Sequence, residues 1–249
     1  MFLVDRDPLL RVLALGAGPP VVLVSGWSAS WEVWEPTLGE LSRHARCIAP
    51  DTRATGWSAE GEGPITLGDL VDDVFRVLDS LDVGRCVIAG QSLGGLVALH
   101  ALCRHPSRFS GICLVSTPLR LDERTTSAVV DGALADYPAT VRTFVQTALP
   151  EPDTEHLRPW AEELFLTTRP DAAVELFRAA TGTPVPDVSG LGVAAAIVHG
   201  TADVVVPVTA AHELADRLPG AQVSILEGAG HVPSITRPRE IAAAVRGLL

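Results

Sequence analysis

Short apolar runs alternate with amphipathic stretches over the first half of the chain. Residues 21–25 (VVLVS) and 46–50 (RCIAP) have the length and composition of buried strands, and residues 67–81 place apolar side chains at helical intervals. Strands that alternate with helices at this spacing predict an α/β fold with a mostly parallel sheet, covered by helices on both faces. The other elements expected in this half are a hairpin over Phe2–Val4 and Leu10–Leu15, a helix near 32–43, a strand at 85–90, a helix at 93–104 and a strand at 111–115.

The alternation stops in the middle of the chain and then resumes. Between residues 118 and 189 no apolar run is typical of a buried strand, and four helical patterns follow one another, at 123–136, 138–148, 154–167 and 171–180. Further on we expect strands at 194–199 and 222–226, and helices at 207–218 and from about 237. We therefore expect an α/β core of residues 1–117 and 190–249, with an all-helical cap of residues 118–189. Such a cap would cover the carboxyl edge of the sheet, where ligands bind.

The composition excludes several classes of partner. The chain has 249 residues, of which 47% are hydrophobic, and it carries a formal net charge of −11 with no lysine. This is enough apolar material for a buried core. No basic block offsets the negative charge, so neither nucleic acid nor an anionic membrane surface is expected as a partner. The sequence leaves the oligomeric state open.

Cysteine usage and the first residues favour a cytoplasmic protein. The four cysteines (Cys47, Cys86, Cys103 and Cys113) form no C-x-x-C pair and stand among apolar residues. This pattern is typical of buried free thiols rather than of a metal site or a disulfide framework. The opening sequence MFLVDRDPLLRVLAL lacks the basic segment and long apolar stretch of a signal peptide, and no membrane span is visible. We expect no metal and no organic cofactor.

One serine stands at an abrupt corner in the segment VIAGQSLGGLVALH, residues 87–100. Gly90-Gln91-Ser92-Leu93-Gly94 matches G-x-S-x-G between a strand pattern and a helical one, which is the setting of a nucleophile elbow. The small flanking residues let strand and helix approach closely, so that the Ser92 hydroxyl projects from a strained turn. The backbone N–H of Leu93 can then face a developing oxyanion at the helix start. In the alternative interpretation, Ser92 only caps the helix.

A serine nucleophile needs a base, and His231 has the right setting among the seven histidines. It follows a strand pattern in the Gly-rich loop LEGAGHVPSI, from which an imidazole can reach across the sheet edge. His199 lies in the last residues of a strand and His212 on a helical face, while His44, His100, His105 and His156 are interpreted as structural or solvated.

The acid expected to orient this base is Asp203, a few residues past the preceding strand in VHGTADVVVP. In the alternative interpretation it is a turn or capping residue. The chain order Ser92, Asp203, His231 is the order for this kind of triad. The segment STPL, which follows strand 111–115, offers no carboxylate, and Asp51 is expected to be structural.

Five segments together resemble the α/β-hydrolase superfamily, in order and at fitting separations: VVLVSGWSASWEVWEP, PDTRATGWS, GQSLGG, HGTADVVVP and GAGHVP. The resemblance runs across nearly the whole chain and implies the α/β-hydrolase fold. It also implies that the backbone N–H of Trp27 is the second oxyanion donor, beside Leu93. Within the superfamily, the short cap and SGWSASWEVW are similar to small carboxylesterases of the pimeloyl-ester type, and DTRATGWS…GPITLGDL to enol-lactone hydrolases.

The chain departs from the family's pattern at two positions. Ser25 stands where members usually have the histidine of a His-Gly pair, and Ala54 stands where they have the glycine of an Arg-Gly pair. The first change can alter how the oxyanion loop is braced, and the second changes a turn near the pocket. Neither removes a triad group.

These residues predict a serine hydrolase that cleaves a carboxylic ester or lactone of a small, mostly apolar molecule. Ser92 attacks the carbonyl, His231 takes and returns the proton, and Asp203 holds the imidazole. Carbon–carbon bond hydrolysis and peracid formation with the same triad are alternatives within enzymes. A protein of this fold that only binds a small molecule is the alternative outside them.

The substrate pocket is expected to be largely apolar. Candidate lining residues are Trp31 on the oxyanion loop and Phe144, Trp160 and Phe165 in the cap. Residues 118–189 contain 12 Asp and Glu against 6 Arg, so acidic protein carriers and multiply charged substrates should be repelled.

Overall fold

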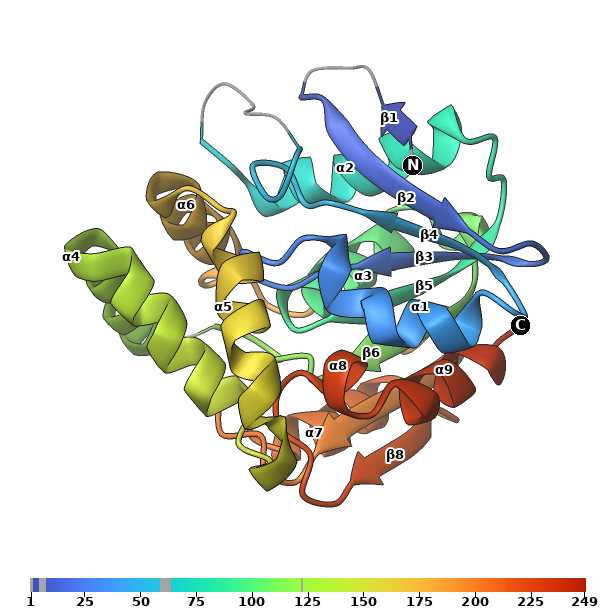
Figure 1. The fold of residues 1–249 in the computed structure, drawn as a ribbon. Helices are drawn as coiled ribbons and strands as arrows, with labels where there is room; N and C mark the ends of the chain where they lie inside the picture. Colours follow the sequence, from blue (N-terminus) through green and yellow to red (C-terminus); the bar gives the residue numbers. More distant parts are fainter. Residues whose placement is uncertain (1, 5–7, 59–63, 122) are drawn as a thin grey trace.

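The computed structural model describes residues 2–4, 8–58, 64–121 and 123–249. Within these residues eight strands form one sheet in the order β1-β2-β4-β3-β5-β6-β7-β8 (Figure 1). From β4 to β8 in this order the neighbouring strands are parallel, whereas β2 is antiparallel to both β1 and β4. The predicted α/β fold with a mostly parallel sheet is therefore confirmed. The strands are β1 Phe2–Val4, β2 Leu10–Leu15, β3 Pro20–Val24, β4 Arg46–Pro50, β5 Cys86–Gln91, β6 Phe109–Val115, β7 Ala194–Gly200 and β8 Gln222–Leu226.

The middle of the sheet is its most buried part. Strand β5 lies between β3 and β6, and all of its residues are buried, because helices cover both faces there. The edge strand β8 is mostly exposed, although its sequence QVSIL reads as apolar. The predicted strand limits agree with the observed ones to within about two residues.

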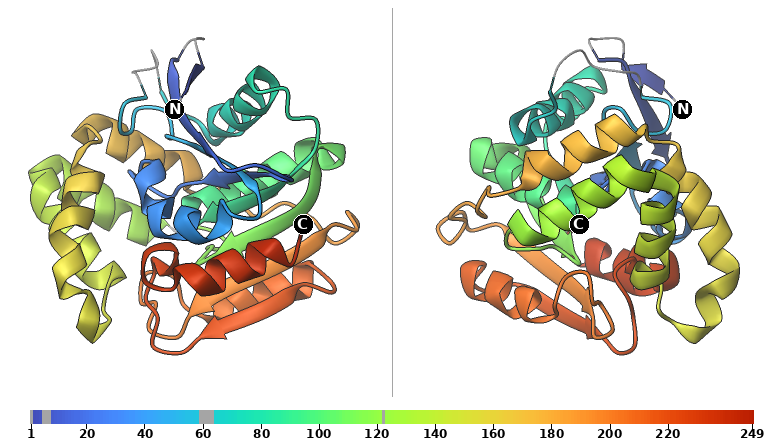
Figure 2. Two further views of the ribbon diagram at one scale, coloured as in Figure 1. Left: turned by 45° about the vertical axis from the view of Figure 1, so that its right-hand side comes forward. Right: turned by 90° about the vertical axis from the view of Figure 1, so that its left-hand side faces the viewer.

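Helices cover the two faces of this sheet. Figure 2 shows α1 and α9 side by side on one face, and α2, α3 and α7 on the other. The predicted helix near 32–43 consists of a short 3₁₀ helix, Trp31–Trp34, followed by α1. The final predicted helix, from about 237, corresponds to α9, and the short α8 precedes it. The helices of the core are α1 Glu35–Leu41, α2 Leu67–Ser80, α3 Leu93–Arg104, α7 Thr209–Arg217, α8 Pro233–Thr236 and α9 Pro238–Arg246.

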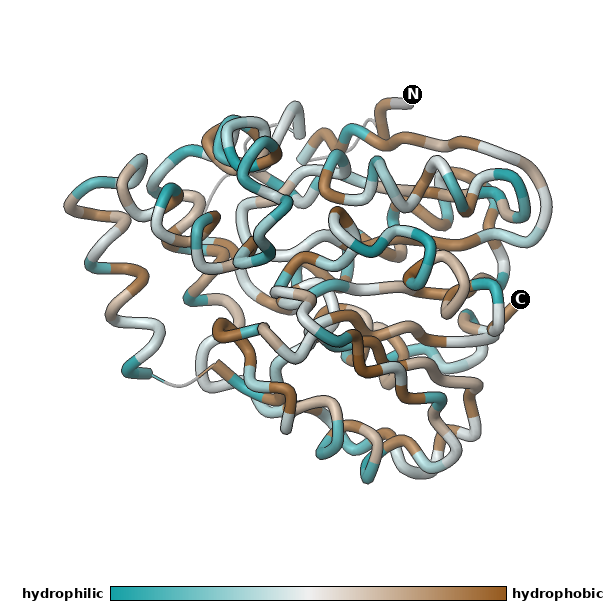
Figure 3. Tube along the Cα trace, turned by 60° about the horizontal axis from the view of Figure 1, so that its bottom comes forward, coloured by the Kyte–Doolittle hydropathy of each residue, from teal (hydrophilic) through white to brown (hydrophobic). Residues whose placement is uncertain are grey.

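Residues 118–189, which we call the cap, leave the sheet after β6 and return to it at β7. They form α4 Glu123–Ala148, a 3₁₀ helix at Pro152–Leu157, α5 Arg158–Leu166 and α6 Pro170–Ala180. These helices stand together beside the sheet (Figures 1 and 2). Hydrophobic and hydrophilic stretches alternate along them in Figure 3, as expected of helices with one buried face. The chain enters and leaves the cap side by side, since the N–H of Gly182 donates to Leu121 O and that of Val185 donates to Leu119 O.

The first cap helix is interrupted where the sequence predicts two helices. Asp136 has φ −156° and ψ 90°, outside the helical region, and Pro138 follows it. The Asp136 carboxylate accepts the backbone N–H of Ala139, which caps the second half of α4. The two helical patterns at 123–136 and 138–148 therefore correspond to the two halves of α4.

The four cysteines are free thiols; Cys47, Cys86 and Cys113 are buried as predicted, whereas Cys103 is half-buried. Burial raises the pKa of Cys47, Cys86 and Cys113 to about 12, so these thiols are protonated at neutral pH. In the described ranges no three side chains of His, Cys, Asp or Glu gather as metal ligands would. Over the same ranges, none of the helices has the length and apolar composition needed to cross a bilayer.

Candidate active site

Ser92 stands on the tight turn between β5 and α3. Its backbone has φ 54° and ψ −120°, a strained conformation for a residue with a side chain. The turn requires glycine on either side. A Cβ at Gly90 would lie 2.3 Å from the carbonyl oxygen of Gly94, and a Cβ at Gly94 would lie 2.2 Å from that of Val24. The Ser92 hydroxyl makes no hydrogen bond to the first turn of α3, which rules out the capping alternative.

His231 reaches Ser92 from the loop between β8 and α8. Its Nε2 lies 3.0 Å from Ser92 Oγ, and its Nδ1 lies 2.8 Å from Oδ2 of Asp203. The imidazole is buried, and the ring of Phe144 meets it edge-on with the ring centroids 6.1 Å apart. The three predicted residues thus form one continuous chain of hydrogen bonds.

Asp203 is a buried carboxylate with four hydrogen-bond donors. Its Oδ1 accepts the backbone N–H groups of Val205 and Val206, each at 2.9 Å. Its Oδ2 accepts from His231 and also lies 3.2 Å from Nε2 of His199. Burial by itself would raise the pKa of Asp203, but His231, His199 and the Val206 N–H together hold it well below its usual range. The carboxylate is therefore ionised at neutral pH.

The two predicted oxyanion donors flank Ser92. Leu93 is the first residue of α3, and the segment Ser25–Ser30 passes next to the elbow, because a Cβ at Gly26 would lie 3.3 Å from that of Ser92. Among the described residues, neither the N–H of Leu93 nor that of Trp27 has a hydrogen-bond acceptor. Both groups are thus available to bind a negatively charged oxygen.

A narrow cavity lies beside Ser92 and His231. Two of the four predicted pocket residues, Phe144 and Phe165, line it, together with Trp27. The Trp27 indole packs against both phenyl rings, at centroid distances of 5.3 and 6.5 Å, and donates a 2.7 Å hydrogen bond to the carbonyl of Ala173. The cap therefore closes directly over the serine.

The other two predicted pocket residues lie outside this cavity. Trp31 turns towards Arg11, whose guanidinium stands 5.8 Å from the ring centroid, and its backbone N–H donates to Asp51. Trp160 packs half-buried against the hydrophobic core. Helical spacing identifies the buried face of a helix, but it does not indicate which part of that face reaches the cavity.

The buried carboxylate of Asp51 holds the loop that carries Trp27. It accepts the backbone N–H groups of Trp31 and Trp57, and its Oδ2 lies 3.0 Å from Nε of Arg11. Burial raises the pKa of Asp51 to about 6, although the Trp31 N–H, Arg11 and the Trp57 N–H oppose this. These contacts are structural, as the sequence predicts for Asp51.

The two departures from the family's pattern have different local effects. The Ser25 hydroxyl donates to the carbonyl of Ser30 at 3.1 Å, which braces the oxyanion loop from within. Ala54 has φ 60°, in the left-handed region that favours glycine. Ala54 therefore holds a conformation that costs a residue with a Cβ about 1 kcal/mol or more.

The structure brings two further ionisable residues to the site, His199 and Glu151, which the sequence did not indicate as functional. His199 contacts Asp203, and its position at a strand end four residues before the acid was a signal for this. Glu151 of the cap is buried, and its Oε1 accepts the N–H of Gly230 at 2.9 Å and the hydroxyl of Thr236 at 2.8 Å. No sequence pattern pointed to Glu151, because its partners lie about eighty residues away.

The chain is similar to known proteins over nearly its whole length. A family model described as the alpha/beta hydrolase fold matches residues 19–190. A pimeloyl-[acyl-carrier protein] methyl ester esterase of Vibrio campbellii is 28% identical over 255 residues, which cover 94% of this chain and 95% of that protein. A strigolactone esterase of Arabidopsis thaliana is 25% identical over 257 residues and covers 96% of both chains. The solved enol-lactonase of Burkholderia xenovorans, 24% identical, has a TM-score of 0.91 over 97% of this chain and 96% of its own, which shows a shared fold.

Proposed function

Because the chain belongs to the alpha/beta-hydrolase family, we propose that it is a serine hydrolase that cleaves a carboxylic ester or lactone of a small, mostly apolar molecule. The observation that supports this most directly is the hydrogen-bond chain from Ser92 through His231 to Asp203. A serine held on a strained elbow, a base within reach and an ionised acid behind the base are the parts that acyl transfer needs.

In the proposed first half-reaction, Ser92 Oγ attacks the substrate carbonyl carbon while Nε2 of His231 takes the hydroxyl proton. The carbonyl oxygen becomes an oxyanion and accepts the N–H groups of Leu93 and Trp27. The carbon–oxygen bond to the leaving alcohol then breaks, and His231 returns the proton to that alcohol. The acyl group remains on Ser92 as an ester.

In the second half-reaction, water replaces the alcohol. His231 takes a proton from the water as its oxygen attacks the acyl carbon, and returns the proton to Ser92 Oγ as that bond breaks. The carboxylic acid leaves and the serine is regenerated. Throughout, the ionised Asp203 holds Nδ1 of His231 and stabilises the imidazolium that forms twice in each cycle.

The cavity supports a small acyl group. Trp27, Phe144 and Phe165 close around Ser92 and leave little free space there, which favours a small acyl group. The cavity walls are mostly apolar and aromatic, which favours an uncharged acyl chain over a carboxylate. Residues 118–189 act in this proposal as the cap that covers the acyl group, and residues 1–117 and 190–249 act as the catalytic core.

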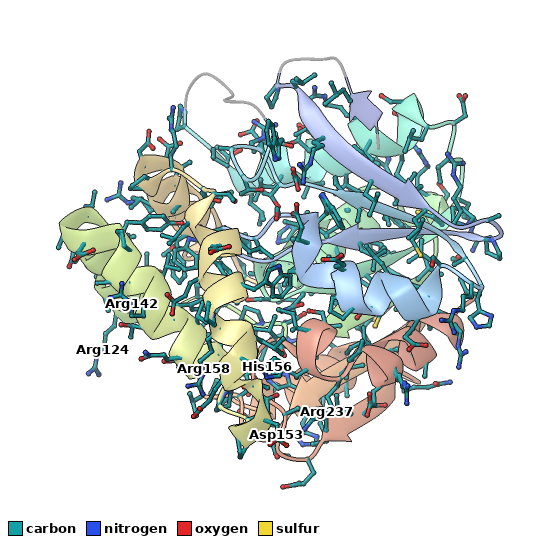
Figure 4. All side chains as sticks on the ribbon, in the orientation of Figure 1. Arg124, Arg142, Asp153, His156, Arg158 and Arg237 are labelled. Carbon is teal, nitrogen blue, oxygen red and sulfur yellow. The ribbon has the colours of Figure 1, made fainter. Side chains whose placement is uncertain are left out.

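The charge of the cap supports neutral substrates over acidic ones. Its 12 acidic residues outnumber its 6 arginines. Arg124 and Arg142 project from the cap in Figure 4, and Arg142 lies 3.9 Å from Glu162. Arg158 donates to the carbonyl of Leu149. We therefore do not propose a carrier-linked ester, the substrate that a relative's name gives, as the substrate of this chain. The free, protonated thiols support an enzyme that works in the reducing cytoplasm.

Labelling with a fluorophosphonate tests the proposed activity. We expect the probe to label Ser92, and labelling and hydrolysis of short-chain esters and lactones to be lost in Ser92→Ala. Ser107→Ala, a change at an exposed serine on the core, should label and hydrolyse like the wild type. A folded protein that the probe does not label would favour the small-molecule binding protein. Labelling with turnover of diketones instead of esters would favour the carbon–carbon bond hydrolase.

A further inference from the structure

A second histidine contacts the acid of the proposed triad. His199 lies near the end of β7, fully buried, with its Nε2 at 2.9 Å from the carbonyl oxygen of Val206 and at 3.2 Å from Oδ2 of Asp203. The same Oδ2 accepts Nδ1 of His231. Two imidazoles from different parts of the chain thus share one carboxylate oxygen.

The partners of His199 determine where its proton lies. A backbone carbonyl only accepts hydrogen bonds, and so does an ionised carboxylate, so Nε2 must carry the proton that both atoms share. Its Nδ1 is buried and has no hydrogen-bond partner among the described residues. A second proton there would be a buried donor with nothing to bind, which is costly. His199 is therefore the neutral Nε2–H tautomer.

No other ionisable side chain reaches His199 within the described ranges. Asp203 is the ionisable side chain that contacts it. On β6, which pairs with β7, the thiol of Cys113 is buried and protonated. The other ionisable groups of the elements packed against β7 are exposed. These are His212, Glu213, Asp216 and Arg217 on α7, Glu227 after β8, and Arg239, Glu240 and Arg246 on α9. The buried Glu151 binds Gly230 and Thr236 instead.

We infer that His199 is a positioning residue, which fixes the carboxylate of Asp203 through its Nε2–H and limits how strongly that carboxylate holds His231. This rests on the proposed function, since positioning matters only if His231 acts as a base. The Val205 and Val206 N–H groups hold Oδ1, and His199 holds Oδ2 while tying the loop 203–206 to β7. A carboxylate that shares its charge between two imidazoles attracts each one less than it would attract a single one.

Two variants of His199 distinguish the effect of its hydrogen-bond donor from the effect of its side-chain volume. Gln places an amide N–H₂ where the histidine has Nε2–H, whereas Met has similar length and no donor. We expect His199→Met to fold, to lower kcat about tenfold with little change in KM, and to move the acid limb of the kcat/KM pH profile upwards by up to about one unit. The carboxylate would then hold the imidazolium of His231 more strongly and less precisely in place. His199→Gln should retain most of kcat and the wild-type profile.

A spectroscopic measurement tests the same inference without turnover. In the wild type labelled with ¹⁵N-histidine, the resonances that disappear in His199→Gln should have the chemical shifts of a neutral Nε2–H imidazole. A ring protonated at Nδ1, or a cation, would overturn the inference even if the Met variant fails to fold. A folded His199→Met variant with wild-type kcat and pH profile would also overturn it. Equal losses of kcat in the Met and Gln variants would do the same. Absent labelling of wild-type Ser92 would instead contradict the proposed function, and the tautomer would still be measurable.

Discussion

The backbone N–H of Gly230 donates a 2.9 Å hydrogen bond to the buried carboxylate of Glu151. Glu151 belongs to the cap, whereas Gly230 precedes His231 in the core. The N–H of His231 itself donates to the carbonyl of Ala148 at 2.9 Å, at the end of α4. The loop of the proposed base therefore takes its position from the cap as well as from the sheet.

Replacing Glu151 should affect both stability and turnover. In Glu151→Ala, the buried Gly230 N–H and the Thr236 hydroxyl lose their acceptor, so the free energy of unfolding should fall by about 2 kcal/mol. The loop of His231 would also be less fixed, and kcat should fall more than KM changes. Denaturant unfolding and steady-state kinetics measure the two effects. Glu155→Ala, at an exposed position of the cap, is the control and should change neither. Unchanged stability and kcat in Glu151→Ala would show that Glu151 does not position the loop of His231.

Asp203→Asn should fold and lose orders of magnitude in rate. The amide would present an N–H₂ group or a weaker acceptor to His231, which disfavours the tautomer that can accept the Ser92 proton, and a loss of about 10⁴ in kcat is expected. Asp187→Asn, at an exposed carboxylate, is the matched control. Near-normal turnover in Asp203→Asn would mean that another group orients the imidazole.

Asp51 should make stability depend on pH in an unusual direction. Its pKa is raised to about 6 by burial in the folded chain, against about 4 in the unfolded chain. Between these values the folded state binds more protons, so the Asp51 contribution to the free energy of unfolding falls as pH rises from about 4 to about 6. Relative to Asp51→Asn, which does not titrate, the free energy of unfolding of the wild type should fall by about 3 kcal/mol across this window. A wild-type stability, relative to Asp51→Asn, that stays constant or rises with pH would contradict this expectation.

Ala54→Gly should stabilise the protein. The residue has φ 60°, and removing its Cβ relieves a left-handed conformation, so a gain of up to about 1 kcal/mol in the free energy of unfolding is expected. Ala244→Gly, inside α9, is the control with the opposite sign, because glycine costs a helix about 1 kcal/mol. Loss of stability in both variants would show that the turn holds no strain that glycine can relieve.

The acidic cap should disfavour charged substrates. A neutral acyl ester should have a higher kcat/KM than the monoester of a dicarboxylic acid of equal length, and the gap should narrow as salt screens the cap. Measurements at low and moderate ionic strength check both points. A clear preference for the dicarboxylate monoester would reverse this expectation and direct attention to the cap arginines, several of which face solvent (Figure 4).

Local patterns were sufficient to predict most of the fold and the centre of the site. Ser92, Asp203 and His231 each follow a strand, and parallel strands end at the same edge of a sheet. The order of strands along the chain was therefore enough to predict that the three side chains meet, as they do. Leu93 and Trp27 flank the serine for the same reason.

The remaining contacts depend on packing between distant segments. Trp31 and Trp160 are apolar residues at suitable spacings, yet one turns to Arg11 and the other into the core. Glu151 looks like an ordinary acidic residue of a turn, and its role follows only from the loop that α4 places beside it. The contact between Asp203 and His199 is easier to predict, since the two residues are only four positions apart in the sequence.

The two junctions of the cap lie next to each other, joined by hydrogen bonds from Gly182 and Val185 to Leu121 and Leu119. Recombination at these two points could replace the whole insert in a gene without opening the sheet or moving the elbow, and so exchange one acyl pocket for another. Such a replacement has one structural requirement. A donor segment must present an acceptor to the N–H of Gly230 and a carbonyl to that of His231, as Glu151 and Ala148 do here. Chimaeras that ignore these two bonds should accept new substrates into a site whose base is out of place.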